Sequence, residues 1–179
     1  MPAVCSARED RVTMTHPASL PIERLLDDCT TRNVRRSGPG GQHRNKVESG
    51  VILRHDPTGV SAEASERRTR LQNHVVAVNR LRRQLALDVR ASRQSAQPSI
   101  EWRSRVRQQR IEVNPHHVLF PTLLAEALDA LDDYDWEISA AADWLGTTTS
   151  QLVKFLKLEP RAFTRLNQER SSRDLKPLR

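Results

Sequence analysis

The chain has 179 residues, of which 37% are hydrophobic, 4% aromatic and 28% charged, and its formal net charge is +7. This length suffices for one domain or two small ones, and the scarcity of aromatic residues argues against a large β-sandwich. The sequence contains neither a run of about 18 apolar residues nor a secretory-type N-terminus, and Cys5 and Cys29 provide no disulfide framework. We therefore expect a cytoplasmic protein with no membrane partner.

Basic residues are concentrated in the middle of the chain. Residues 32–114 hold 18 of the 29 Lys and Arg residues, and all but one of these 18 are Arg. Residues 115–143 carry seven acids and no base, and the acidic helix expected within this segment should face solvent or a basic protein partner. Because arginine forms bidentate contacts with phosphate, the central block favours a nucleic-acid partner over a merely solvated charged surface.

In chain order, residues 1–17 are expected to be unstructured and 19–29 to form a short helix. A strand is expected near 33–36, and the segment 48–66 predicts an antiparallel hairpin. Its two strands are joined by Asp56-Pro57-Thr58-Gly59, whose residue types are typical of a type I turn. Apolar residues then recur at helical spacing and predict a helix across this sheet: Leu71, Val75, Val78, Leu81 and Leu85.

The C-terminal half predicts a second, helical unit over 119–158. Ala142, Gly146 and Phe155 lie at positions typical of a helix-turn-helix, with helices expected over 138–145 and 149–158. The preceding segment is basic, and Trp102 is expected to anchor it to one of the domains. Residues after 158 form a basic end.

The segment 37–42, Ser-Gly-Pro-Gly-Gly-Gln, carries the strongest chemical signal. Two adjacent glycines allow the backbone to approach a crowded target, and Gln42 adds a neutral amide and its own backbone N–H. Such a loop has no general base and no metal ligand, so any catalysis must come from positioning and from N–H donation to a reacting oxygen. Basic residues on both sides suit contact with RNA phosphates: Arg35, Arg36, Arg44 and Lys46.

This stretch resembles the catalytic domain of the class I peptide chain release factors and of their codon-independent relatives that rescue stalled ribosomes. The resemblance covers about residues 32–88. It runs through the matching residues of 35–43, 45–48, Val51, Leu53, His55, 57–60, 66–69 and Asn73. Arg44 and Arg70 depart from the residues usual at these positions, and both departures add positive charge.

The resemblance implies hydrolysis of the peptidyl-tRNA ester in the peptidyl transferase centre, with large-subunit ribosomal RNA and P-site peptidyl-tRNA as partners. The implied catalytic residues are Gly40, Gly41 and Gln42, with Gln42 also the target of a glutamine methyltransferase; no cofactor or metal is expected. Together with the basic residues of the segment and of the C-terminal end, it predicts an RNA-binding set: Arg35, Arg36, His43, Arg44, Asn45, Lys46, Arg67, Arg68, Arg70, Arg161, Arg165, Arg170, Arg173 and Lys176.

The expected fold class is α+β, with a small antiparallel sheet and packed helices followed by an all-α helix-turn-helix-like domain, in a monomer. The expected organisation is a disordered tail over 1–17, a Gly-Gly-Gln domain over 18–92, a basic linker over 93–118, the helical domain over 119–158 and a basic tail over 159–179. Neither a Pro-Ala-Thr, a Pro-Val-Thr nor a Ser-Pro-Phe tripeptide occurs, which argues against stop-codon reading. Two alternatives stay open: a non-hydrolytic ribosome-binding factor and a helix-turn-helix DNA-binding regulator.

Overall fold

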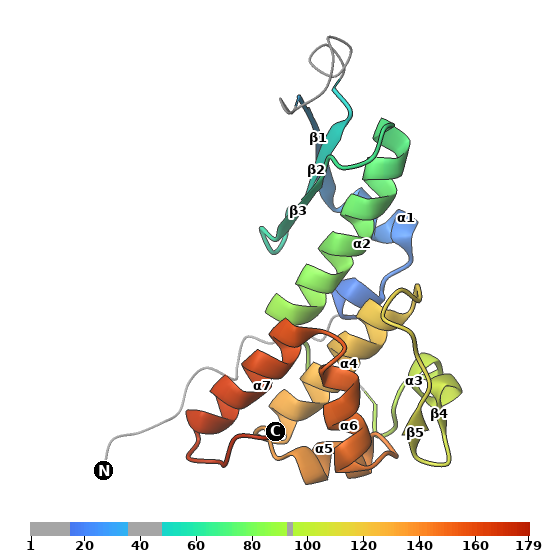
Figure 1. Cartoon of the computed structure of the whole chain (residues 1–179). Coiled ribbons are helices and arrows are strands. Elements are labelled where there is room, and N and C mark those ends of the chain that lie inside the picture. Colours follow the sequence, from blue (N-terminus) through green and yellow to red (C-terminus); the bar gives the residue numbers. More distant parts are fainter. Residues whose placement is uncertain (1–14, 36–47, 93–94) are drawn as a thin grey trace. The chain divides into compact units, whose positions relative to one another are not determined.

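The computed structural model describes residues 15–35, 48–92 and 95–179, which fold into two compact units (Figure 1). The first, here called the sheet unit, comprises 17–35, 48–89 and 116–125. The second, the helical unit, comprises 15–16, 90–92, 95–115 and 126–179. None of the helices in the described ranges is long and apolar enough to cross a membrane.

The sheet unit is built on three antiparallel strands in the order β1 (Cys29–Val34), β2 (Gly50–His55) and β3 (Ser61–Ala64). A 3-10 helix, η1 (Pro17–Ser19), and a short helix, α1 (Ile22–Asp27), precede the sheet. Cys29 pairs with His55 at one end of the β1–β2 ladder, and Val34 pairs with Gly50 at the other. Strands β2 and β3 also pair antiparallel, from Val51–Ala64 to Arg54–Ser61, which confirms the predicted hairpin 48–66. The residues 36–47 that connect β1 to β2 lie outside the described part.

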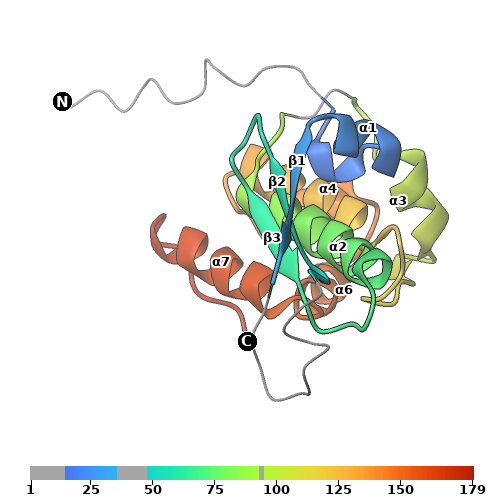
Figure 2. The ribbon, with the colours of Figure 1, turned by 90° about the horizontal axis from the view of Figure 1, so that it is seen from above.

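Helix α2 (Arg70–Asp88) contacts β2 and β3 and runs along one face of the sheet (Figure 2). Val51 and Leu53 of β2 alternate with less buried neighbours, so one face of the strand enters the core, as its period-2 pattern requires. The expected stripe on α2 is only partly buried: Leu71 and Val75 are 75% and 54% exposed. The buried face near the start of the helix is formed instead by Asn73 and Ala77, each two residues after an exposed member of that stripe.

A buried arginine fastens the other side of α2. The guanidinium of Arg82 donates to the carbonyl of Ala18 at 3.0 and 3.2 Å, to that of Val118 at 3.1 Å and to Thr122 Oγ1 at 3.1 Å. Four hydrogen bonds offset part of the free-energy cost of burying this charge. The contacts attach η1 and the segment 116–125 to the sheet unit.

Two boundaries differ from expectation at the start of the chain. The helix expected over 19–29 is the shorter α1, and the strand expected near 33–36 begins earlier, at Cys29. Pairing with β2 explains the difference, because the ladder extends to the Cys29–His55 pair and draws Thr30 and Thr31 into extended backbone. The β-branched threonines suit a strand better than a helix.

The helical unit contains α3 (Ile100–Arg105), α5 (Ile138–Trp144), α6 (Thr149–Leu156) and α7 (Pro160–Ser171), and the part of α4 (Phe120–Asp133) from Glu126 onward. Trp102 is buried; its Nε1 donates to Leu145 O at 2.8 Å, and its ring packs edge-on against Phe155. This confirms the expected anchoring role of Trp102.

Taken together, the small antiparallel sheet and the packed helices confirm the expected α+β class.

The segments expected as linker and tail contain regular structure. Strands β4 (Val106–Arg107) and β5 (Arg110–Ile111) form a two-stranded ladder after α3, and α7 occupies much of 159–179. In the acidic segment, Asp129 does not face solvent as expected: it is 7% exposed, with Oδ1 2.9 Å from Arg90 Nη1 and 3.2 Å from the Ala91 amide. This expectation was wrong for Asp129 because Arg90 and the Ala91 amide, from a distant part of the sequence, provide its polar partners inside the unit.

Candidate functional site

The Gly-Gly-Gln segment joins two neighbouring antiparallel strands of the sheet unit, β1 and β2. The predicted catalytic residues Gly40, Gly41 and Gln42 lie outside the described residues. The same holds for five members of the predicted RNA-binding set: Arg36, His43, Arg44, Asn45 and Lys46. What the structure describes is the base from which this segment leaves and to which it returns.

An ion pair and a close backbone approach define that base. Arg35 Nε lies 3.0 Å from Glu48 Oε1, so the last described residue before the segment contacts the first one after it. One residue pair further into the sheet, a Cβ on Gly50 would lie 2.8 Å from Val34 Cγ2 and 2.9 Å from Val34 O. Only glycine fits this approach without displacing β1, so the two strands are held tightly together where the segment begins.

Asn73, on the buried face of α2, ties three elements to this base. Its Nδ2 donates to Ser49 O at 2.6 Å and to Arg67 O at 3.0 Å, and its Oδ1 accepts from Arg67 N at 2.8 Å. The side chain is completely buried and uses both its donor and its acceptor groups. Asn73 therefore fixes Ser49 relative to the connection that leads into α2. Ser49 lies between Glu48 and Gly50, at the base of the Gly-Gly-Gln segment, which is called the hairpin base below.

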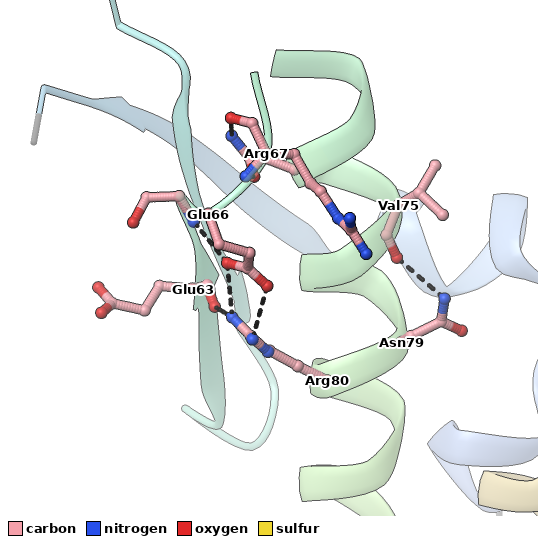
Figure 3. A network of polar contacts seen from close by, with 8 residues as sticks. Glu63, Glu66, Arg67, Val75, Asn79 and Arg80 are labelled. Carbon is pink, nitrogen blue, oxygen red and sulfur yellow. Dashed lines mark hydrogen bonds and ion pairs between the residues drawn. The ribbon is translucent and has the colours of Figure 1, made fainter. Parts of the chain in front are cut away.

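A second polar contact braces the same connection (Figure 3). Arg80 Nη2 donates to Glu66 Oε1 at 2.7 Å, and Arg80 Nη1 donates to Glu63 O at 2.7 Å. Hydrogen bonds from the backbone N–H groups of Glu66 and Ser65, together with the nearby Arg80, lower the pKa of the Glu66 carboxyl. The connection from β3 to α2 is thus held at Glu66 by Arg80 and at Arg67 by Asn73.

Three predicted RNA-binding residues project from this braced connection: Arg67, Arg68 and Arg70. All three are exposed, and none of their guanidinium groups makes a hydrogen bond or an ion pair within the described residues. Since Asn73 holds the backbone of Arg67 and the carbonyl of Ser49 together, the structure places these arginines in the same unit as the hairpin base. Arginines without carboxylate partners suit a polyanionic ligand.

Cys29 and His55, the titratable side chains at the other end of the β1–β2 ladder, have structural roles. Burial, followed by the charges of Asp56 and Asp28, raises the pKa of Cys29 to about 11, and its thiol donates to Leu25 O at 3.0 Å. Burial lowers the pKa of His55, whose Nδ1 lies 2.8 Å from Thr58 Oγ1 in the turn after β2. A thiol with such a raised pKa is a poor nucleophile at neutral pH.

The predicted C-terminal RNA-binding residues belong to the helical unit, and their surroundings differ. Arg161 pairs with Glu159 at 3.2 Å, whereas Arg165 and Arg173 share Glu169 at 4.0 and 2.7 Å. Arg170 is only 7% exposed and donates to Trp136 O at 2.7 Å and to Lys176 O at 3.0 Å. Arg170 therefore serves the packing of this unit, while Lys176 is exposed.

Comparison with known proteins identifies the family. The RF-1 domain model matches residues 21–117, more than half of the chain. Peptide chain release factor 2 of Variovorax paradoxus is 40% identical over 83 residues, or 46% of this chain and 23% of that protein. Its counterpart in Lactiplantibacillus plantarum is 40% identical over 107 residues, or 50% of this chain and 28% of that protein.

An uncharacterized peptide chain release factor-like mitochondrial protein of Saccharomyces cerevisiae is 46% identical over 76 residues, which cover 41% of this chain and 48% of that protein. The alignments thus span about a quarter of the two release factors and about half of the yeast protein. The matched range 21–117 includes the Gly-Gly-Gln segment, its described base and the arginines that precede α2. The chain therefore belongs to the class I release factor-like family defined by the RF-1 domain.

Proposed function

We propose that this chain hydrolyses the peptidyl-tRNA ester on the ribosome without reading a codon. The observation that carries the proposal is the position of Gly40, Gly41 and Gln42 within the RF-1 domain match, between two strands whose junction is tightly held. The names of the similar proteins, which are peptide chain release factors, support the same reaction class.

The reaction needs a water molecule and a polarised ester. Water adds to the carbonyl carbon that links the nascent peptide to the terminal ribose of P-site tRNA. The bond from this carbon to the ribose oxygen then breaks, a proton passes to that oxygen, and the peptide leaves with a free carboxyl group. In this proposal the Gln42 backbone N–H donates to a reacting oxygen as negative charge develops on it, and the Gln42 side chain orients the water.

Binding of RNA in this proposal falls to the arginines of the sheet unit. Arg67, Arg68 and Arg70 are exposed and lack carboxylate partners among the described residues, so they are free to contact ribosomal RNA or tRNA phosphates. Arg35 lies beside the Gly-Gly-Gln segment, but its pairing with Glu48 means that it adds no net charge there. Large-subunit ribosomal RNA and P-site tRNA are the proposed partners, and a glutamine methyltransferase acting on Gln42 is a further one.

Codon independence is supported by what accompanies the RF-1 domain in this sequence. The helical unit contains a helix–turn–helix formed by α5 and α6, with Gly146 at φ +66° in the turn. The tripeptides associated with stop-codon reading do not occur in the sequence. The lysine of α6, Lys154, lies in the last turn of the helix and not near its N-terminus, where helix–turn–helix proteins contact bases, so this unit suits docking better than base reading.

A reconstituted release assay tests both parts of the proposal. Ribosomes carrying labelled peptidyl-tRNA are prepared on mRNAs that end at the P-site codon, that continue into a sense codon or that present a stop codon. We expect release on the truncated mRNA and no added release from a stop codon. Release confined to stop codons would contradict codon independence, and ribosome binding without release on any mRNA would favour a non-hydrolytic factor.

A further inference from the structure

The β4–β5 hairpin of the helical unit carries an unusual charge arrangement. Arg107 and Arg110 are direct cross-strand partners in this two-stranded ladder. Like charges placed opposite each other on a ladder destabilise it. Both residues are exposed, and neither guanidinium makes an ion pair or a hydrogen bond with any residue that the structure describes. This arrangement therefore favours an anion that binds both side chains.

The tip of this hairpin has a fixed conformation. Gln108 and Gln109 connect the two strands with φ values of +47° and +63°, as in a two-residue turn with positive φ at both central positions. Thr147, in the turn between α5 and α6, donates through Oγ1 to Gln109 O at 2.6 Å. Thr147 is buried, so the tip is fastened to the helical unit while its arginines stay in solvent.

We propose that this hairpin is a second RNA-binding site, which grips the phosphate backbone of double-stranded RNA through Arg107 and Arg110. A guanidinium group can bind two oxygens of a phosphate bidentately. The exposed Gln108 and Gln109 amides suit ribose hydroxyls, which identify RNA in a duplex. Single-stranded RNA is disfavoured because such sites stack bases on aromatic rings, and the tip sequence Arg-Gln-Gln-Arg has none.

The choice of RNA over DNA rests on the proposed ribosomal function as well as on the two glutamine amides. The site itself does not involve the Gly-Gly-Gln segment. It also differs from the C-terminal RNA-binding residues expected from the sequence. Arg161, Arg165 and Arg173 have acidic partners within the helical unit, whereas Arg107 and Arg110 have none among the residues that the structure describes. Unpaired arginines are more available to phosphate, because no internal ion pair has to break first.

The test is a fluorescence anisotropy titration of the full chain with a short labelled RNA duplex at several salt concentrations. The variant R107Q/R110Q is compared with R24Q/R54Q, which removes the same charge at exposed positions of the sheet unit. We expect R107Q/R110Q to raise the Kd about tenfold and to reduce the slope of log Kd against log salt concentration by about one to two. The control variant should behave like wild type. Equal effects of the two double variants would overturn the proposal.

Two further measurements keep the result unambiguous. Relief of the like charges is expected to raise the Tm of free R107Q/R110Q by about 1–3 °C, and a clear fall in Tm would mean that the arginines are structural. The assignment to RNA would also be overturned if R107Q/R110Q raised the Kd for a DNA duplex of the same sequence, or for an acidic peptide, by more than it raises the Kd for the RNA duplex. No ester is present in this titration, so its outcome is independent of whether the chain releases peptides.

Discussion

Asn73 Nδ2 donates to the carbonyl oxygen of Ser49 at 2.6 Å, which joins α2 to the chain just before β2 begins. The same side chain holds both backbone groups of Arg67. One buried amide thus connects the base of the Gly-Gly-Gln hairpin to the arginines that we propose contact RNA. In the proposed function, the geometry at the ends of the Gly-Gly-Gln segment and the contact with RNA therefore depend on a common support.

Replacing Asn73 with alanine tests this support. The substitution leaves the Ser49 and Arg67 backbone groups without partners, so we expect the free energy of unfolding to fall by about 2–3 kcal/mol. At a temperature where the variant is folded, we expect it to release peptide with a lower kcat than wild type. The matched control is N79A on the same helix, because the Asn79 amide is exposed and donates to Val75 O within that helix (Figure 3). A stability loss as large in N79A as in N73A would contradict the role of Asn73.

Gly50 offers a second test of the hairpin base. In G50A the new methyl group meets both the side chain and the carbonyl oxygen of Val34, so we expect a loss of about 1–3 kcal/mol in unfolding free energy, measured by urea denaturation. The double variant V34A/G50A removes only the side-chain clash. It should stay less stable than V34A, since the carbonyl of residue 34 remains 2.9 Å from the added carbon. Full recovery would show that the strands are not packed as closely as described.

How far the sequence predicts this fold depends on how local each signal is. The turn 56–59 and the apolar spacing around Leu81 are local patterns, and both the hairpin and α2 follow them. The start of β1 at Cys29 was missed because it depends on pairing with His55, which is 26 residues away. Long-range pairing of this kind overrides local helical spacing.

The candidate site divides in the same way. The Gly-Gly-Gln motif and the arginines before α2 could be found from residue types alone, whereas the role of Asn73 could not. A polar residue on the buried face of α2 was the available signal, yet its partners come from two other segments. The β4–β5 ladder escaped prediction because two-residue strands leave no periodic pattern, and Gln108-Gln109 is not a turn sequence that the usual preferences favour.

Arg170 distinguishes a structural arginine from an RNA-binding one. We expect R170A to lose about 2–4 kcal/mol of unfolding free energy, because the buried carbonyl of Trp136 loses its donor. The exposed Lys176 provides the comparison, and K176Q should change stability by less than about 0.5 kcal/mol. Urea denaturation of both variants measures this difference. If R170A were as stable as wild type but bound RNA more weakly, Arg170 would be an RNA-binding residue and not a structural one.

Asp129 makes stability depend on pH. Burial raises the pKa of Asp129 to about 7, and the nearby Arg90 opposes this rise. Between about pH 4 and 7 the folded chain therefore binds a proton that the unfolded chain releases, so this group's contribution to stability falls as pH rises, by at most about 1.4 kcal/mol per unit. His55, whose pKa is lowered by burial, acts in the opposite direction.

Comparison of wild type with D129N isolates the Asp129 contribution, since His55 is present in both proteins. The stability of wild type relative to D129N, measured by urea denaturation, is expected to decrease steadily from pH 4 to pH 7. A difference that stays constant over this range would mean that Asp129 is ionised throughout in the folded protein.

Single-turnover release of labelled peptide from ribosomes stalled on truncated mRNA tests the central claim most directly. Wild type is expected to free the peptide. Gly41→Ala is expected to bind the same ribosomes and to release the peptide at least about a hundredfold more slowly, the scale expected when an oxyanion donor is displaced. Gln42→Ala keeps the backbone N–H but loses the amide that orients the water, so it is also expected to bind and to release the peptide more slowly than wild type. Wild-type chain that binds these ribosomes and leaves the peptide on its tRNA would contradict the account.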